Sequence, residues 1–314
     1  MKIPTFLKKS KLSYSIYNFF RKSKLKHNIP LYKKYGINKK YYASISSLDF
    51  EKLDEQVNLF DKTDSRVELP NNKEFQKLDK NIQEKLLPWS EKGYVVLDAF
   101  YSNEEVDTIN TEVDRLIKTK KASWRYNRIL FANKISNLIN NTGTSKKLTT
   151  ILSLLLGKEV RLFQSLNFIQ GSQQKSHSDF IHMTTFPKGN LIAVWIALED
   201  TTLENGLLHY YPGSHKLPYI LNNDFDNVGT KYRLGDKTYG DYEDKIAEVI
   251  QQNKLKKEVF LAKKGDLLIW HANLLHGGEP VLDKNATRKS MVFHYYAKDV
   301  ICYHEITQRP TLTS

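Results

Sequence analysis

Short, mainly apolar segments follow one another through the second half of the 314-residue chain, and they limit the choice of fold most. They are rich in Leu, Ile, Val, Phe and Tyr, and turn-forming stretches such as PKGN, ENG, PGS, KKGD and HGGEP separate them. Apolar runs of this length, bounded by Gly, Pro and Asn, are typical of β-strands. The expected strands are residues 161–169, 191–198, 207–211, 258–262, 266–270 and 290–296.

Helical patterns come mostly before these strands. Ser102 and Glu105 form a capping box ahead of an amphipathic run. A second helix is expected over residues 146–156, where Gly157 would end it, and a third over 242–253, inserted among the strands. Helices followed by many short strands predict a mostly β fold with helical support, which would be an antiparallel sandwich or a jelly roll.

The positive charge of the chain is concentrated at its start. The net charge is +13, and residues 1–48 hold 12 Lys or Arg and no Asp or Glu. The other 266 residues hold 36 Lys or Arg against 35 Asp or Glu, so they are nearly neutral. Basicity is therefore no argument for nucleic-acid binding by the core, and no nucleic-acid partner is expected.

Residues 1–48 form a basic arm in which apolar side chains are interleaved with lysines. Ile16, Phe19 and Phe20 stand at helical spacing. Such a segment would lie on an anionic membrane surface or meet an acidic protein partner, or else pack on its own domain. The longest apolar run, residues 191–198, is far below the ~20 residues that span a bilayer.

The cysteine content and the first residues favour a cytoplasmic setting, with peripheral membrane contact through the arm as an added hypothesis. Cys302 is the single cysteine, so no disulfide within the chain is expected, and we expect its thiol to be inert. The sequence also opens without the apolar core of a secretory signal.

The expected organisation has four successive parts. The basic arm (1–48) is followed by a polar connector (49–85) and by the main domain (86–304), and a tail (305–314) ends the chain. Within the main domain, residues 222–253 are rich in Asp, Asn, Tyr and Gly, and we expect them to form a lid over a pocket.

The stretch QKSHSDFIHMTT carries the first candidates for chemistry. At a strand end, residues i and i+2 point the same way, so His177 and Asp179 would converge on one point. His182 stands at i+3 from Asp179 and would point away from it. We therefore expect His182 and Met183 to contact substrate rather than metal, with Tyr210 as a further substrate contact.

A metal site needs a third ligand, and His276 is best placed among the other histidines. It ends the run DLLIWHANLLH at the HGGEP turn, 97 residues beyond Asp179, while His271 is its main rival. Two histidines and one carboxylate form the facial triad of non-haem Fe(II) oxygenases, which leaves positions for a 2-oxo acid and O2. A 2-oxoglutarate cosubstrate would also need a cation; Arg288 suits this role, and Ser290 could add a hydroxyl.

The chain resembles the phytanoyl-CoA dioxygenase family of Fe(II)/2-oxoglutarate oxygenases over roughly residues 86–296. The resemblance rests on WSEKGYVVLDAF, HSD, AVWIALEDTTLENGLLHYYPGSHK, GDLLIWHANLLHGGEPV and TRKS. The block from the Trp-x-Ala strand to Pro-Gly-Ser-His is much more specific than the triad itself. Ser178 stands where the family commonly has Gln.

This resemblance implies a double-stranded β-helix, which is a jelly-roll, cupin-like core, with N-terminal helices. It implies that His177, Asp179 and His276 hold iron, the last because the family motif ends on it. It further implies that Arg288 binds the C5 carboxylate of 2-oxoglutarate, with Trp195 and Ser290 beside it.

The expected reaction is hydroxylation of a C–H bond, with release of succinate and CO2. In halogenases of this type a small residue replaces the carboxylate, so the presence of Asp179 favours hydroxylation. The expected substrate is a small molecule or a tethered acyl group. Two alternatives stay open: a binding protein without turnover, and an oxygenase that reaches a membrane-associated or macromolecular substrate through its basic arm.

Overall fold

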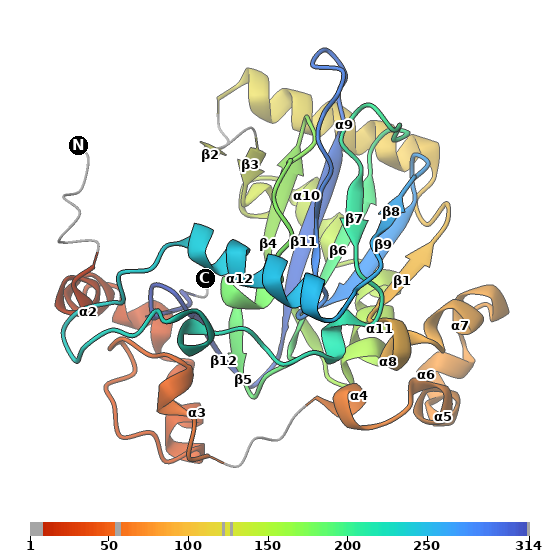
Figure 1. Ribbon diagram of the computed structural model, residues 1–314. Helices are drawn as coiled ribbons and strands as arrows, with labels where there is room; N and C mark the ends of the chain where they lie inside the picture. Colours follow the sequence, from red (N-terminus) through yellow and green to blue (C-terminus); the bar gives the residue numbers. More distant parts are fainter. Residues whose placement is uncertain (1–8, 54–57, 121–122, 126–127, 313–314) are drawn as a thin grey trace.

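Three antiparallel sheets form the centre of the computed structural model, which describes residues 9–53, 58–120, 123–125 and 128–312 (Figure 1). The largest sheet has seven strands in the order β1-β9-β6-β11-β4-β3-β2. Its strands are β1 (Tyr94–Leu97), β2 (Ser123–Arg125), β3 (Arg128–Leu130), β4 (Val160–Phe168), β6 (Leu191–Ala197), β9 (Leu267–His271) and β11 (Ser290–Ala297).

Two smaller sheets have three strands each. One has the order β10-β7-β8, with β10 (His276–Gly278), β7 (Leu208–Tyr210) and β8 (Glu258–Phe260). The other has the order β13-β12-β5, with β13 (Arg309–Pro310), β12 (Ile301–His304) and β5 (Thr184–Phe186).

Side chains of the large sheet alternate between two hydrophobic layers. Trp195 of β6 packs with residues of β7 and β8, such as Leu208 and Phe260, in the layer between the sheets. Its neighbours Val194 and Ile196 belong to the layer on the other face. This alternation is the two-residue period of strands with both faces buried. The two facing sheets form the expected jelly roll, so the predicted fold class is confirmed.

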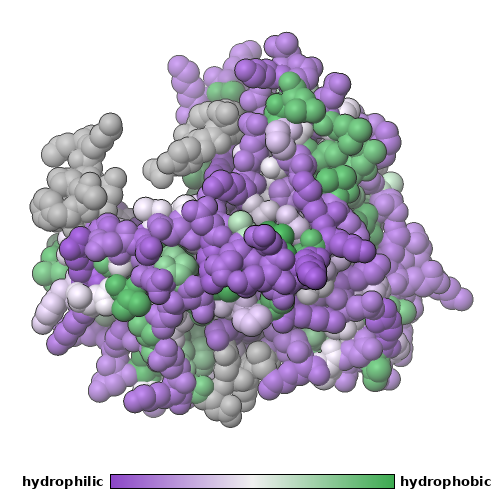
Figure 2. Space-filling model, viewed as in Figure 1, coloured by the Kyte–Doolittle hydropathy of each residue, from purple (hydrophilic) through white to green (hydrophobic). Residues whose placement is uncertain are grey.

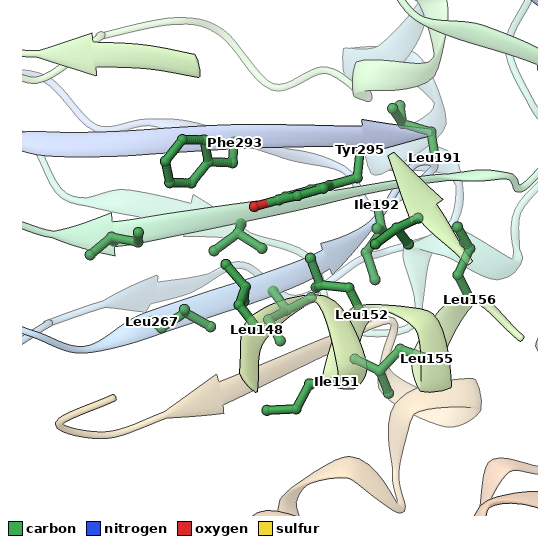
Figure 3. Close-up of a cluster of buried hydrophobic side chains, with 14 of the residues drawn as sticks. Leu148, Ile151, Leu152, Leu155, Leu156, Leu191, Ile192, Leu267, Phe293 and Tyr295 are labelled. Carbon is green, nitrogen blue, oxygen red and sulfur yellow. The ribbon is translucent and has the colours of Figure 1, made fainter. Parts of the chain in front are cut away.

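Helix α11 (Lys146–Leu156) covers the outer face of the large sheet. Figure 3 shows its Leu148 and Leu152 pointing towards Ile192 and Phe293 of the strands. The helix ends as predicted, because Gly157 adopts a left-handed conformation with φ of 65°. Helix α9 (Asn103–Lys118) begins with the predicted capping box and packs its buried face on the same core.

The six expected strands correspond to β4, β6, β7, β8, β9 and β11, with ends that differ by up to two residues. Helix α12 (Tyr239–Gln252) starts three residues before the predicted helix. Thr238 and Asp241 form a capping box there, which fixes the earlier start.

The described part of the basic arm packs on its own domain. It contains α2 (Lys11–Phe19), η1 (Lys22–Leu25), α3 (Asn28–Lys34) and η2 (Ser47–Asp49). Leu31 and Tyr32 are buried with Phe186 and Tyr303. The backbone N–H of Lys11 donates to the carbonyl of residue 232 at 3.0 Å. The first eight residues of the predicted arm lie outside the described residues.

The predicted connector is largely helical where it is described. Phe60, Leu69 and Phe75 belong to the main hydrophobic core, so this segment belongs to the domain. Its elements are α4 (Leu59–Lys62), α5 (Ser65–Glu68), η3 (Leu69–Asn71), α6 (Lys73–Gln76) and α7 (Lys80–Leu86). The remaining elements are α8 (Trp89–Lys92), η4 (Ala132–Lys134), α10 (Asn137–Gly143), η5 (Asp179–Ile181), η6 (Ser214–Lys216) and η7 (Asn222–Phe225).

None of the helices among the described residues is both long enough and apolar enough to cross a membrane. On the face seen in Figure 2, hydrophilic residues predominate over α12, whereas hydrophobic residues appear among them on the left, where Figure 1 draws α2.

Candidate metal and cosubstrate site

Two histidines meet across a short antiparallel bridge. The backbone N–H of His177 donates to the carbonyl of His276, and the reverse bond also forms, each at 2.9 Å. Asp179 begins the 3-10 turn η5 directly afterwards. The strand-end geometry expected for the His-x-Asp pair therefore holds at His177, whereas the turn delivers Asp179. One ligand atom of each of the three residues lies within 4.8 Å of the others, and all three side chains are buried.

Both histidines present the nitrogen that a metal needs. The Nδ1 atom of His177 lies 2.8 Å from the carbonyl oxygen of Lys175, and that of His276 lies 3.0 Å from the carbonyl of Leu274. A carbonyl only accepts, so each Nδ1 carries the hydrogen and each Nε2 keeps its lone pair. Burial, with the nearby His276, lowers the pKa of His177 to about 3, so this ring is neutral at neutral pH.

The two carboxylate oxygens of Asp179 have different partners: one accepts hydrogen bonds, and the other faces the two ligand histidines. Its Oδ2 accepts from Nε1–H of Trp270 at 2.8 Å and lies 3.3 Å from Nε2 of His294. The amide of Gln164 approaches Nδ1 of His294 at 3.2 Å, which makes Nδ1 the acceptor and Nε2 a donor to Asp179. The Oδ1 atom lies 3.9 and 3.7 Å from the Nε2 atoms of the two ligand histidines. It is therefore available to a metal.

The charge state of Asp179 fits this role. Burial opposes its ionisation, but the neighbouring His276 and His294 outweigh burial and hold the pKa of Asp179 below its usual range. An ionised oxygen together with two imidazole nitrogens is the donor set that non-haem iron prefers. The residues present therefore fit the metal that the sequence implied.

The other histidines have different partners. His271, the rival third ligand, places its Nε2 3.2 Å from the Asp61 carboxylate. His215 lies in the η6 turn, and its Nε2 contacts the backbone carbonyl of Ser90 at 3.3 Å. His209 pairs with Glu279 at 2.8 Å. These partners leave His276 as the third member of the triad.

A cavity of about 810 Å³ opens beside the triad. Arg288 lines it and is only 2% exposed. Its guanidinium carbon lies 5.5 Å from the ring centre of Trp195 and 6.0 Å from that of Phe168. Burial lowers the pKa of Arg288 to about 10, with Glu199 opposing the shift, so the side chain stays cationic at neutral pH.

Three buried groups at or near Arg288 that can donate hydrogen bonds have no hydrogen-bond partner within the described part of the chain. They are Nε of Arg288, Nε1 of Trp195 and Oγ of Ser290. Buried polar groups normally find partners, because leaving one unpaired costs about 1–3 kcal/mol. A buried cation beside two further groups that can donate hydrogen bonds is the kind of site that suits a carboxylate.

The residues predicted to contact substrate lie in different places. His182 and Met183 line the cavity. The Nδ1 atom of His182 lies 3.4 Å from Nε2 of His304, a cavity residue that sequence reasoning did not select. Tyr210 lies instead in the layer between the sheets, with its ring 4.5 Å from that of Tyr94 and outside the cavity lining.

Ser178 contacts helix α12, which belongs largely to the predicted lid (222–253). The Ser178 backbone N–H donates to the Tyr242 hydroxyl at 3.1 Å, and its Oγ lies 3.2 Å from the same atom. Tyr239, on the same helix α12, accepts from the Gln174 amide at 3.1 Å. Residue 178 therefore faces α12 and connects that helix to the segment that carries His177 and Asp179. The role of residues 222–253 as a lid stays a prediction.

Sequence reasoning missed Trp270 as a partner of Asp179. A signal was present in the expected strand over 266–270, because Leu268 and Trp270 share the face that looks between the sheets. It also missed Tyr17 and Lys24 of the arm and Arg309 of the tail, which line the cavity. Nothing in the local pattern of those segments indicates their position.

Comparison with known proteins points to the family that the sequence motifs resemble. The chain matches the family model described as "Phytanoyl-CoA dioxygenase (PhyH)" over residues 89–290. A phytanoyl-CoA dioxygenase domain-containing protein 1 homolog of Dictyostelium discoideum is 25% identical over 183 residues, which cover 56% of this chain and 56% of that protein. The ectoine dioxygenase of Nocardia farcinica (strain IFM 10152) is 25% identical over 214 residues, which cover 62% of this chain and 71% of that enzyme.

Solved structures share the fold. The non-heme alpha ketoglutarate dependent carbocyclase SnoK from nogalamycin biosynthesis aligns with a TM-score of 0.59 at 17% identity, over 72% of this chain and 87% of SnoK. EctD from S. alaskensis with bound Fe aligns with a TM-score of 0.54 at 20% identity, over 70% of this chain and 77% of EctD. EctD has also been solved with 2-oxoglutarate and 5-hydroxyectoine.

The chain spans just over half the length of the Dictyostelium relative. The family model, in contrast, covers most of this chain and includes all three metal ligands and Arg288. The protein belongs to the phytanoyl-CoA dioxygenase family of Fe(II)/2-oxoglutarate-dependent oxygenases.

Proposed function

We propose that the protein hydroxylates a C–H bond of a small-molecule or acyl substrate, consuming O2 and 2-oxoglutarate and releasing succinate and CO2. One observation carries this proposal: the ligand atoms of His177, Asp179 and His276 gather beside a cavity that also holds the buried, cationic Arg288. A structural metal site would need neither open coordination positions nor a buried cation near them.

Each residue has a separate task in this proposal. The triad would hold Fe(II), and bound iron with 2-oxoglutarate would supply the oxidising chemistry. Arg288 would bind the far carboxylate of the cosubstrate through its guanidinium, with Trp195 Nε1 and Ser290 Oγ as further donors. Trp270 and His294 would keep Asp179 on a single metal-facing oxygen.

The environment would favour hydroxylation. Asp179 occupies the coordination position that halogenases of this type leave to a halide. Apolar side chains such as Leu166 and Val292 line the cavity next to the triad. They would exclude water from the reacting atoms and so limit side reactions. The alternative of a binding protein without turnover is disfavoured by the intact triad and arginine.

Replacement of Asp179 tests the metal centre. We expect the wild-type protein, mixed with Fe(II) and 2-oxoglutarate without oxygen, to develop a visible charge-transfer band. Asp179→Ala should lose most of it, because it removes the only anionic ligand of the triad. The exposed Asp200→Asn serves as the control and should keep the band. A wild-type protein that shows neither the band nor succinate formation with candidate substrates would contradict the oxygenase proposal.

Trp270→Phe tests the orientation of Asp179. The substitution keeps a buried aromatic ring and removes the N–H that donates to Oδ2 at 2.8 Å. Loss of such an outer partner typically weakens metal binding ~10- to 100-fold, and we expect a loss of that order in a calorimetric Fe(II) titration. Trp195→Phe is the matched control, since its Nε1 has no contact with Asp179. Equal iron affinity in wild type and Trp270→Phe would refute the orienting role.

Arg288→Gln tests the cosubstrate site. Losing a charged hydrogen bond of about 1.5–3 kcal/mol should weaken 2-oxoglutarate binding roughly 10- to 100-fold. Anaerobic titration of the charge-transfer band measures this affinity, and iron content should not change. Lys289→Gln is the control, because Lys289 pairs with Asp114 at 3.7 Å on another side. An unchanged 2-oxoglutarate affinity in Arg288→Gln would exclude this residue as the carboxylate partner.

Membrane contact through the arm is a second proposal, motivated by apolar side chains that the packed arm leaves exposed. Leu12 and Phe20 are 64% and 79% exposed among the arm's lysines. Leu12→Ser with Phe20→Ser should reduce co-sedimentation with anionic vesicles. Leu203→Ser with Leu282→Ser, which are exposed elsewhere, should not. Wild-type protein that fails to sediment with anionic vesicles would rule out this membrane contact.

A further inference from the structure

The walls of the catalytic cavity include residues from both ends of the chain. Tyr17, Asn18 and Lys24 of the arm and Arg309 of the tail line it together with the triad. All four lie outside residues 89–290, the part that matches the family model. This part of the cavity wall therefore lies outside the segment that matches the family model.

The charges of the cavity walls are mostly positive. Five cationic side chains line the cavity, whereas Asp179 is the single carboxylate among the described lining residues. The cationic residues are Lys24, Arg128, Lys134, Arg288 and Arg309. A divalent iron and a dianionic 2-oxoglutarate would cancel each other's charge, so the loaded site would keep this excess. A concave site lined by charges of one sign attracts ligands of the other.

The cations are divided between two ends of the cavity. Along β11, Ser290 near Arg288 pairs with Phe168, while His294 beside Asp179 pairs with Gln164. Tyr296, two residues further, contacts Phe163 at a ring distance of 5.0 Å. The end beyond the metal thus lies opposite the cosubstrate arginine.

Lys24 and Lys134 belong to this far end. Phe163 contacts Phe131 at 6.0 Å, and Lys134 Nζ lies 4.9 Å from the Phe131 ring. Burial, with the nearby charges of Lys24 and Arg161, lowers the pKa of Lys134. Cations that crowd one another in this way repel, and a bound anion would relieve that repulsion.

The tail brings a third cation, Arg309, to the same region. The guanidinium carbon of Arg309 lies 5.0 Å from the ring centre of Tyr14 on α2, the helix that also carries Tyr17 and Asn18. Arg309 follows β12, whose His304 contacts His182 beside the triad. Arm and tail therefore meet at the wall that holds the expected substrate contacts.

We propose that the far end of the cavity binds an anionic oxygen group of the substrate, phosphate or carboxylate, through Lys24, Lys134 and Arg309. The proposal rests on the proposed function, because it names the substrate class of that same oxygenase. A phosphate or carboxylate accepts several charge-assisted hydrogen bonds, which matches a group of lysine and arginine donors. The anchored anion would hold the rest of the substrate towards the triad.

Matched small probes test the charge requirement. Phenyl phosphate, benzoate and phenol share one ring and differ in charge. The protein is loaded with Mn(II) and saturating 2-oxoglutarate, and each probe is titrated by calorimetry. We expect both anions to bind at least ~10-fold more tightly than phenol. The tighter of the two identifies phosphate or carboxylate as the preferred group. Equal binding of all three probes would overturn the proposal.

Variants locate the anion. Lys24→Gln with Lys134→Gln should weaken anion binding roughly 10- to 100-fold, and so should Arg309→Gln, while Arg309→Lys should retain most of it. Lys33→Gln with Lys40→Gln removes two exposed cations of the same arm outside the cavity and should change nothing. Circular dichroism verifies that each variant is folded. Equal losses in the control and the cavity variants would contradict a defined site.

The two proposals fail in different ways. Absence of the Fe(II)/2-oxoglutarate band would overturn the oxygenase function, while the probe titrations, repeated without 2-oxoglutarate, would still measure the anion site. If 2-oxoglutarate abolished probe binding, the probe would have occupied the Arg288 end, and the far-end site would be refuted.

Discussion

The antiparallel bridge between His177 and His276 is the contact on which the site depends. Its two backbone hydrogen bonds join positions almost a hundred residues apart. One partner enters the β10-β7-β8 sheet, and the other leads into the 3-10 turn that begins with Asp179. A shift of one residue in this pairing would turn an imidazole away from the cavity, since alternate residues of a strand face opposite sides. The geometry of the triad therefore follows from sheet register.

Backbone pairing alone does not orient the carboxylate. Trp270 reaches Asp179 from β9 of the large sheet, and His294 reaches it from β11. The ligands thus come from the bridge and the turn, while their orienting partners come from the facing sheet. The metal site therefore depends on the jelly roll being closed, with both sheets at their proper separation.

Local pattern was sufficient for much of this architecture. The strand over residues 161–169 and the helix ended by Gly157 were predictable, because period, caps and turns are local signals. The 3-10 turn at Asp179 was not, since sequence spacing does not show where a chain leaves a sheet. The segment was expected to be a polar connector, yet Phe60 and Phe75 give its short helices buried contacts with the core. Tertiary packing decides such marginal helices.

The charges in the sequence divide the chain into a basic arm and a nearly neutral remainder. They could not show that Lys24 of the arm faces the cavity while Lys33 does not. A count of charges does not show where each side chain points, because that depends on how the segment packs. The arm packs through Tyr32 against the sheet that contains β12, and through Tyr14 beside Arg309.

The iron and cosubstrate side of the cavity and the wall opposite it have to meet different chemical requirements. Iron and cosubstrate impose a fixed donor set, and the residues that would face them, the triad and Arg288, all fall within the segment that matches the family model. The opposite wall has to fit one particular substrate, and part of it comes from segments outside that match. Relatives therefore inform the chemistry at Asp179 better than the choice of substrate. The charges of the arm and tail residues in the cavity are where that choice has to be sought.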